Sequence, residues 1–141
     1  LKAVQAPVSP EIRGLRTDAK ILLVEDNLVN QLVVQEMLKQ FGLDAETADN
    51  GAEALAKLSE HNERFDLVLM DCHMPTMDGY EATKKIRSAD AENPHYDVPI
   101  IALTANTMKG EREKCLAAGM TDYLAKPIDL QQLEDKLAEY L

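Results

Sequence analysis

Short apolar runs alternate along the chain with longer segments in which apolar residues recur at helical spacing. Apolar runs bounded by polar residues are typical of strands that are buried on both faces of a sheet. They predict strands over 20–24, 43–48, 65–70, 98–103 and 121–124. The amphipathic segments between them predict helices. The first runs over 28–41, and the last carries an apolar stripe formed by Leu130, Leu133, Leu137 and Tyr140.

Short polar residues and glycines mark the expected helix ends. Asn50, Asp78 and Asp129 each precede a helical segment, where such a side chain accepts a hydrogen bond from a free backbone amide. Gly42 and Gly119 follow helical segments, and a residue in the left-handed conformation commonly ends a helix. These positions set the predicted boundaries between helices and loops.

Five strand–helix repeats predict an α/β fold, with helices covering both faces of a parallel sheet. Crossovers between parallel strands are right-handed, and open sheets of this kind bind ligands where the strand order reverses. We therefore expect a flavodoxin-like (βα)5 three-layer sandwich with a parallel five-stranded sheet of order 2-1-3-4-5. Residues 20–141 would form this domain, and residues 1–19, which lack periodicity, would form a linker or flexible arm.

Charged and hydroxyl side chains stand where the predicted strands end. The pair Glu25 and Asp26 follows the first strand, Asp71 the third and Thr104 the fourth. Lys126 comes shortly after the fifth. Because the carboxyl ends of parallel strands meet at one edge of a sheet, we expect these side chains to share one small pocket.

Three carboxylates in one pocket disfavour each other's ionisation unless a positive charge lies among them. A hard divalent cation with oxygen ligands supplies that charge, and a few ligands with water suit Mg²⁺ better than Ca²⁺. We assign Asp26 and Asp71 as direct ligands and Glu25 as a ligand through a bound water. The alternative is that Glu25 and Asp26 only begin a loop and cap the first helix, but the third carboxylate at a separate strand end argues against it.

Asp71 is the expected nucleophile, because a carboxylate can attack a phosphoryl group and hold it as an acyl phosphate. Lys126 adds positive charge beside the phosphoryl oxygens, and the hydroxyl of Thr104 can donate a hydrogen bond to one of them. Taken singly, a threonine or a lysine at a strand end is more often a solvated terminus. The shared position at the carboxyl ends of different strands carries this assignment.

Four motifs occur in a familiar order. They are Val24-Glu25-Asp26-Asn27, Met70-Asp71-Cys72-His73-Met74-Pro75-Thr76-Met77-Asp78-Gly79, Leu103-Thr104-Ala105 and Lys126-Pro127. Over about residues 20–141 the chain resembles the receiver domain of two-component response regulators. The sequence around Asp71, with the segment Asn27-Leu28-Val29-Asn30, is most similar to receivers of hybrid sensor histidine kinases.

This resemblance implies a role in a two-component phosphorelay, in which Asp71 accepts a phosphoryl group from a phosphohistidine. It implies that the backbone carbonyl of His73 also binds Mg²⁺, and that Thr104 and Tyr123 move on phosphorylation as a switch. Such a domain catalyses its own aspartyl phosphorylation and dephosphorylation, and this chain contains no kinase domain. The side chains of His73 and Asn106 are given only a tuning role.

The first predicted helix offers a surface to the phosphoryl donor. Its sheet-facing side is expected to contain Val33, Val34, Met37, Leu38 and Phe41. Leu28 and Leu32 fall on the opposite side, next to the acidic pocket. We expect them to contact a histidine kinase or a histidine-phosphotransfer domain, with Gln31 and Gln35 at the rim. Isolated exposed apolar residues are common, so the two leucines alone do not decide this.

Composition narrows the class of protein. The net charge of −10 argues against nucleic acid and anionic membranes as partners of this domain. Cys72 and Cys115 show neither a metal-ligand spacing nor a disulfide framework, which suits a reducing cytoplasm. Because the chain starts at Leu1, we expect a fragment of a longer protein, for example the cytoplasmic part of a membrane-anchored sensor kinase.

Three other functions stay open at this point. A Mg²⁺-dependent phosphohydrolase with an aspartate nucleophile usually has a second aspartate two residues later, where this chain has His73. A flavodoxin-like cofactor binder needs a phosphate loop after the first strand, which is missing. A degenerate receiver that only docks partners would not need all five pocket residues.

Overall fold

The computed structural model describes residues 18–60, 64–88, 95–105 and 109–141. Its five parallel strands lie in the order β2-β1-β3-β4-β5, as predicted. The strands are β1 (Lys20–Val24), β2 (Asp44–Ala48), β3 (Leu67–Asp71), β4 (Ile100–Thr104) and β5 (Asp122–Ala125). The helices are α2 (Leu28–Lys39), α3 (Gly51–Leu58), α4 (Gly79–Ser88), α5 (Lys109–Ala118) and α6 (Leu130–Tyr140).

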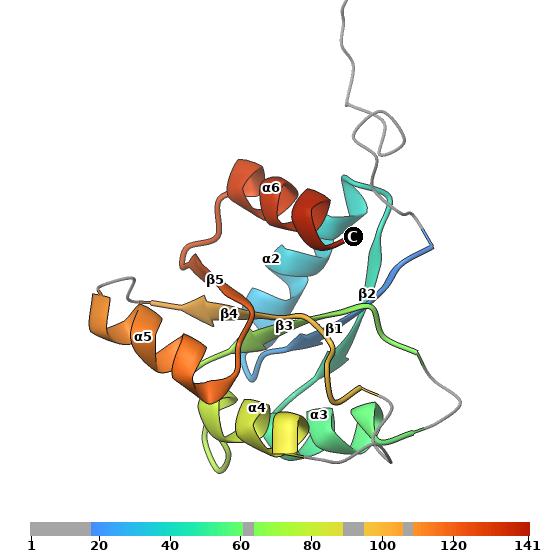
Figure 1. Ribbon diagram of the computed structural model, residues 1–141. Helices are drawn as coiled ribbons and strands as arrows, with labels where there is room; N and C mark the ends of the chain where they lie inside the picture. The colour runs from blue at the N-terminus through green and yellow to red at the C-terminus, as the bar shows by residue number, and fades with distance from the viewer. Residues whose placement is uncertain (1–17, 61–63, 89–94, 106–108) are drawn as a thin grey trace, which may run out of the picture.

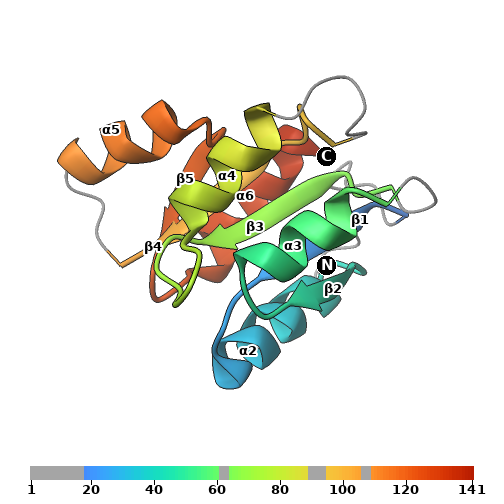
Figure 2. The same ribbon diagram turned by 90° about the horizontal axis from the view of Figure 1, so that it is seen from below.

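The helices cover both faces of the sheet and give the three layers (Figure 1). Helices α2 and α6 lie over one face, and α3 and α4 lie side by side over the other (Figure 2). Helix α5 packs beside α4 at the end of the sheet where β4 and β5 lie. Each face has its own apolar core, and the strand side chains point alternately into the two.

The central strands β3 and β4 are buried along their whole length, which explains their continuous apolar sequences. The edge strand β2 is buried only at Ala48. The first predicted strand matches β1, and each of the other four differs from the structure by one or two residues at one or both ends. Asp71 and Thr104 are the last paired residues of their strands, opposite Leu103 and Ala125. Phe65 lies before β3, because its amide donates to the ring of His95 instead of to a neighbouring strand.

The predicted caps begin three helices. The side chains of Asn50, Asp78 and Asp129 accept hydrogen bonds from backbone amides of α3, α4 and α6. Asn27 caps α2 in the same way, which the sequence analysis did not predict. Gly42 and Gly119 have φ angles of 78° and 105°, as expected for the left-handed residue that ends a helix.

The prediction for the sheet-facing side of α2 is partly wrong. Val34 and Leu38 are buried, but Val33 is 48% exposed, and Gln31 lies inside. The inward positions are therefore 31, 34 and 38, which follow the spacing of three and four residues along one helix face. The prediction grouped apolar residues together and so placed Val33 about a third of a turn too far inward.

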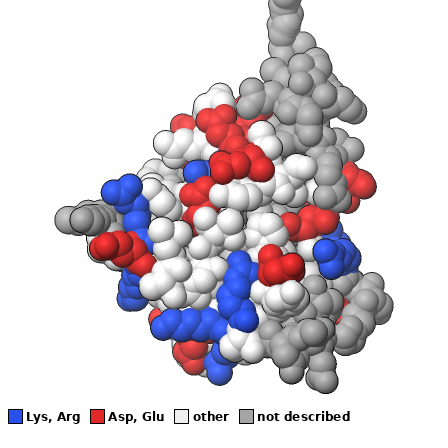
Figure 3. Space-filling model, in the orientation of Figure 1, with Lys and Arg blue, Asp and Glu red and all other residues white. Residues whose placement is uncertain are grey.

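The surface carries both signs of charge. On the side shown in Figure 3, acidic side chains gather over α6 and basic ones lie over α5 and below it. Within the described residues, no helix is both long and apolar enough to cross a bilayer. Residues 1–17 lie outside the described part of the chain, so the division into an arm over 1–19 and a domain over 20–141 stays a prediction.

Candidate functional site

The three acidic side chains meet at the carboxyl edge of the sheet. Carboxylate oxygens of Glu25, Asp26 and Asp71 all lie within 4.8 Å of one another. Glu25 and Asp71 are buried, whereas Asp26 is exposed at the mouth of the site. Parallel pairing of β1 with β3 in register, with Val24 opposite Met70, puts the residues that follow side by side.

Lys126 lies among these carboxylates. Its Nζ atom is 3.1 Å from Oδ1 of Asp71 and 3.2 Å from Oε1 of Glu25. The main chain holds it there, because the Lys126 amide donates to the carbonyl of Thr104 at 2.8 Å and extends the β4–β5 pairing. The next peptide bond, Lys126–Pro127, is cis.

The charges of the site fit a divalent cation. Three carboxylates face the single ammonium of Lys126, so these four groups together carry two uncompensated negative charges. Burial, followed by a hydrogen bond with Glu25, raises the pKa of Asp26. Burial alone would lower the pKa of Lys126, but the neighbouring Asp71 and Glu25 outweigh it and raise that pKa. A hard cation with oxygen ligands would relieve the remaining repulsion.

Backbone contacts fix the phosphoacceptor candidate Asp71. The amide of His73 donates to Oδ1 of Asp71 at 3.1 Å. The amide of Gly79 donates to the carbonyl of Cys72 at 3.0 Å, which folds the β3–α4 loop back over the strand end. A Cβ atom on Gly79 would collide with the carbonyl oxygen of Asp71, so only glycine allows this close approach.

The two predicted switch residues lie on neighbouring strands. Thr104 is buried at the end of β4. Tyr123 is half-buried on β5, and its hydroxyl accepts a hydrogen bond from Arg112 of α5 at 3.1 Å. The guanidinium of Arg112 also lies 5.9 Å from the centre of the Tyr123 ring. The phenol is therefore held at the α5 side of the sheet.

The side chain of His73 is exposed and packs edge-on against Tyr80, with 5.9 Å between the ring centres. The hydrogen bond from His73 to Asp71 comes from the backbone amide. Asn106, the other residue given a tuning role, lies outside the described residues.

Gln31 is the clearest correction among the predicted site residues. It was expected at the rim of a partner surface, but it is only 6% exposed. Its amide nitrogen donates to the carbonyl of Glu25 at 2.6 Å and to Oδ1 of Asp49 at 2.9 Å. Gln31 thus supports the backbone of the acidic site from beneath α2. Gln35 is half-buried and donates to the carbonyl of Ala45 on β2, so it also faces the sheet.

The outer side of α2 carries an apolar patch that is larger than predicted. Leu28, Leu32 and two valines are exposed, by 67% for Leu28, 66% for Val29, 57% for Leu32 and 48% for Val33. We call these four residues the α2 patch. Neither valine was predicted to belong to this surface, although the spacing of three and four residues around Val34 and Leu38 already pointed Val33 outward.

Comparison with known proteins decides the family. The model of the response regulator receiver domain matches residues 21–138 of the chain. The chain belongs to this family. The receiver domain predicted from the sequence is thereby confirmed as a module of two-component phosphorelay signalling.

The relatives of this receiver domain include histidine kinases, and several from Dictyostelium discoideum are named hybrid signal transduction histidine kinases. "Sensor protein GacS" of Pseudomonas syringae is 41% identical over 94% of the chain, and "Probable histidine kinase 1" of Oryza sativa is 40% identical over 87%. The chain spans only 14% and 15% of the lengths of these relatives.

Two solved receiver structures have the same fold as this chain, and each shows one further feature of its own. The receiver domain of the sensor histidine kinase PA1611 from Pseudomonas aeruginosa is 46% identical, with a TM-score of 0.76 over 86% of this chain and 96% of that one. It has magnesium coordinated in its active site cleft. The receiver domain of Ssk1 from Saccharomyces cerevisiae, crystallised with the histidine phosphotransfer protein Ypd1, is 32% identical. Its TM-score is 0.79, over 86% of this chain and 88% of that one.

Proposed function

We propose that this receiver domain accepts a phosphoryl group on Asp71 from a phosphohistidine, with Glu25, Asp26, Asp71 and the carbonyl of His73 holding Mg²⁺. The observation that carries this proposal is the convergence of three carboxylate groups and Lys126 at one sheet edge. When bound, Mg²⁺ neutralises charge on the phosphoryl oxygens and lets the acids approach them.

Asp71 acts as the nucleophile. Lys126 and the His73 amide both bind Oδ1, so we assign the attack to Oδ2. A bond forms between Oδ2 and phosphorus while the bond from phosphorus to the donor imidazole breaks, and the imidazole nitrogen keeps the electron pair. Lys126, which pairs with Asp71 before the reaction, stays beside the carboxyl group and stabilises the charge of the phosphoryl oxygens. Hydrolysis of the acyl phosphate by water restores the carboxylate.

The switch involves Thr104 and Tyr123. The Thr104 hydroxyl would bond to a phosphoryl oxygen, and Tyr123 would leave Arg112 and turn inward toward the space that Thr104 vacates. The contact between Tyr123 and Arg112 lies at the surface, so its loss costs little free energy. A phosphoryl group that favours the inward state by roughly 1–3 kcal/mol is enough for a switch of this kind.

Phosphorylation of the whole chain tests this proposal. In Mg²⁺ buffer with acetyl phosphate, the wild type should gain one phosphoryl group, as read by intact mass, and Asp71→Asn should gain none. A beryllium fluoride mimic should shift the amide signals near Thr104 and Tyr123. Equal incorporation in Asp71→Asn would contradict the assignment of the nucleophile, and unchanged signals with the mimic would contradict the switch.

The donor is a histidine kinase or a histidine-phosphotransfer domain that docks on the α2 patch. The patch lies on the helix that follows the acidic site directly, and its four exposed apolar side chains suit an apolar helix face on the partner. The Ssk1 receiver forms a complex with a phosphotransfer protein, which supports a partner of this class. Gln31 and Gln35 take no part in this surface, because their side chains bond inward.

Leu28→Ser together with Leu32→Ser should slow transfer from a histidine-phosphotransfer partner by at least about tenfold, because two central apolar contacts are lost. Phosphorylation by acetyl phosphate should be unchanged, since both leucines are exposed on the outer side of α2. Leu116→Ser is the matched control, because this leucine is 56% exposed but lies on α5. Equal transfer rates in the double variant and the wild type would exclude the α2 patch as the docking surface.

We place this domain in the cytoplasm, as part of a sensor kinase of the hybrid class that several of its relatives represent. The two thiols, Cys72 and Cys115, are unbridged and buried, which suits a reducing compartment. Within this assembly the domain is the phosphoryl acceptor, and it catalyses its own phosphorylation and dephosphorylation.

A further inference from the structure

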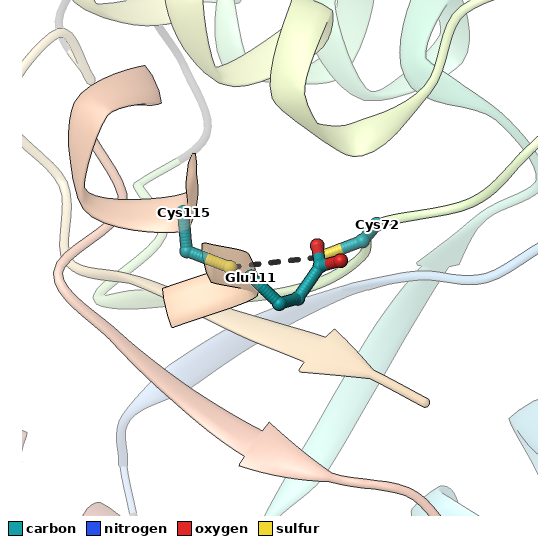
Figure 4. Close-up of side chains that lie close together, drawn as sticks. All are labelled: Cys72, Glu111 and Cys115. Atoms are coloured by element: carbon teal, nitrogen blue, oxygen red, sulfur yellow. Dashed lines mark hydrogen bonds between the residues drawn. The ribbon is translucent and has the colours of Figure 1, made fainter. Parts of the chain in front are cut away.

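Cys72, Cys115 and Glu111 form a second cluster of possible ligand atoms, separate from the acidic site. The two sulfur atoms are 4.0 Å apart although the residues are 43 positions apart in the chain. One atom of each of the three side chains lies within 4.8 Å of the others. Figure 4 shows the two thiols pointing toward each other, with the Glu111 carboxylate beside Cys72. This cluster could not be predicted from the sequence, because only the fold brings Cys72, the residue after β3, close to helix α5.

We propose that these three side chains form a site for a thiophilic divalent cation of the Zn²⁺ type. Zn²⁺ binds cysteine sulfur at about 2.3 Å in a tetrahedral arrangement, which places two sulfur ligands about 3.8 Å apart. The observed 4.0 Å is close to that spacing. A disulfide requires about 2.05 Å between the sulfur atoms, so the pair would have to move together by nearly half its separation.

Glu111 supplies the second, independent observation. Its Oε2 atom is buried and has no hydrogen-bond partner among the described residues. A buried carboxylate oxygen without a partner costs free energy, and a cation at the cluster would remove that cost. Glu111 and Cys115 are four residues apart on α5, so both side chains lie on the same face of the helix. Three protein ligands would leave a fourth position for water.

Two simpler explanations account for less. Close packing of two small apolar residues explains the buried cysteines but not the buried Oε2 atom of Glu111, which has no hydrogen-bond partner among the described residues. A redox-active pair would have to bring the two sulfur atoms from 4.0 Å to about 2.05 Å, and it would leave Oε2 of Glu111 without a partner. Cation binding instead displaces the two thiol protons to solvent as the bonds to sulfur form. Glu111 is half-buried, which gives the cation a path from solvent along its side chain.

A cation at this site would join α5 to the residue directly after Asp71. Cys72 is already fixed at both backbone groups, by the carbonyl of Leu103 and the amide of Gly79. Helix α5 also carries Arg112, which holds Tyr123. Occupancy would therefore restrain α5 relative to the end of β3, on the side of the sheet where the proposed switch residue lies.

Co²⁺ is the probe for a test, because thiolate ligands give it an absorption band that carboxylates do not. The full chain, reduced with a non-chelating phosphine, is titrated with Co²⁺ in an excess of Mg²⁺ that keeps the acidic site filled. We expect one equivalent of Co²⁺ to produce the thiolate charge-transfer band, and Zn²⁺ to abolish it by displacement. Absence of the band would overturn the proposal.

Variants locate the site. Cys72→Ala and Cys115→Ala should each abolish the band, and Glu111→Gln should weaken Co²⁺ binding by at least about tenfold. Glu113→Gln, on the same helix but exposed, and Asp26→Asn, in the acidic site, should leave the band unchanged. An unchanged band in Cys115→Ala would overturn the assignment. A second result would also overturn the proposal. If the reduced chain shows no band and a thiol oxidant lowers its mass by two hydrogens, the two cysteines form a disulfide pair. Circular dichroism of each variant separates loss of the ligand from loss of the fold.

Discussion

Asp122 at the amino end of β5 and Asp26 after the carboxyl end of β1 are both acids at a sheet edge, but their surroundings move their pKa values in opposite directions. Burial acts to raise the pKa of Asp122, but hydrogen bonds from Lys136, the Tyr123 amide and Tyr140 lower it below 3.8. Burial and the neighbouring Glu25 raise the pKa of Asp26.

At the edge of the sheet where the strands begin, which we call the amino edge, further polar groups are paired by hydrogen bonds. Phe65 donates its amide to Nε2 of the buried His95 at 2.9 Å, so Nδ1 carries the proton and donates to the carbonyl of Leu58 at 2.7 Å. Asp66 accepts the amide of Lys20. The amino edge is thus built for stability, whereas the carboxyl edge keeps an excess of negative charge that a cation and a phosphoryl group can use.

The largest effect on stability is expected at the amino edge. His95→Ala should lower the free energy of unfolding by about 3 kcal/mol, because the Phe65 amide and the Leu58 carbonyl both lose a buried partner. Urea unfolding measures the loss. His73→Ala is the matched control, since that histidine is exposed, and it should change stability by less than about 0.5 kcal/mol. Equal losses in the two variants would mean that His95 has no special structural role.

The second prediction concerns how stability at the amino edge depends on pH. Asp122→Asn should lower the free energy of unfolding by about 1–2 kcal/mol at pH 7, because it weakens charge-assisted hydrogen bonds with Lys136 and Tyr140. The pKa of Asp122 is lower in the folded state than its ordinary value of 3.8. The stabilisation is therefore fully present above that pH and is lost as the pH falls below it.

Unfolding curves of wild type and Asp122→Asn between pH 7 and pH 2 measure how the difference in unfolding free energy depends on pH. A difference that persists unchanged at the lowest pH would show that the carboxylate charge is not its source.

The smallest effect on stability is expected at the carboxyl edge, where the substitution should stabilise the fold instead of weakening it. Asp26→Asn should raise the free energy of unfolding in chelator by less than about 1 kcal/mol, since it removes one of three mutually repelling charges and Asp26 is exposed. Mg²⁺ should then raise the melting temperature of the wild type but not that of the variant. Scanning calorimetry with and without Mg²⁺ measures both. Destabilisation of Asp26→Asn in chelator would contradict the idea that this edge is strained by its charges.

The same contrast explains what could be predicted from the sequence. The strand order and the meeting of Glu25, Asp26 and Asp71 follow from strand patterns and parallel pairing, which are local signals joined by one topological rule. Gln31 was predicted wrongly and the buried role of His95 was not predicted, because a polar residue in a helix or loop gives no sign of a buried partner far away in the chain. The partners that draw them inward, Glu25 and Asp49 for Gln31 and Phe65 and Leu58 for His95, are assembled only by the fold.

Gly79 limits how this site can be redesigned. Helix α4 begins directly against the main chain of Asp71, with no room for a side chain between them. Even alanine at position 79 would push the helix outward or tilt the aspartate, so the width of the entrance cannot be tuned there. Engineers who wish to alter the half-life of the acyl phosphate should vary the exposed loop positions His73 and Pro75, where larger or smaller side chains should change solvent access to Asp71.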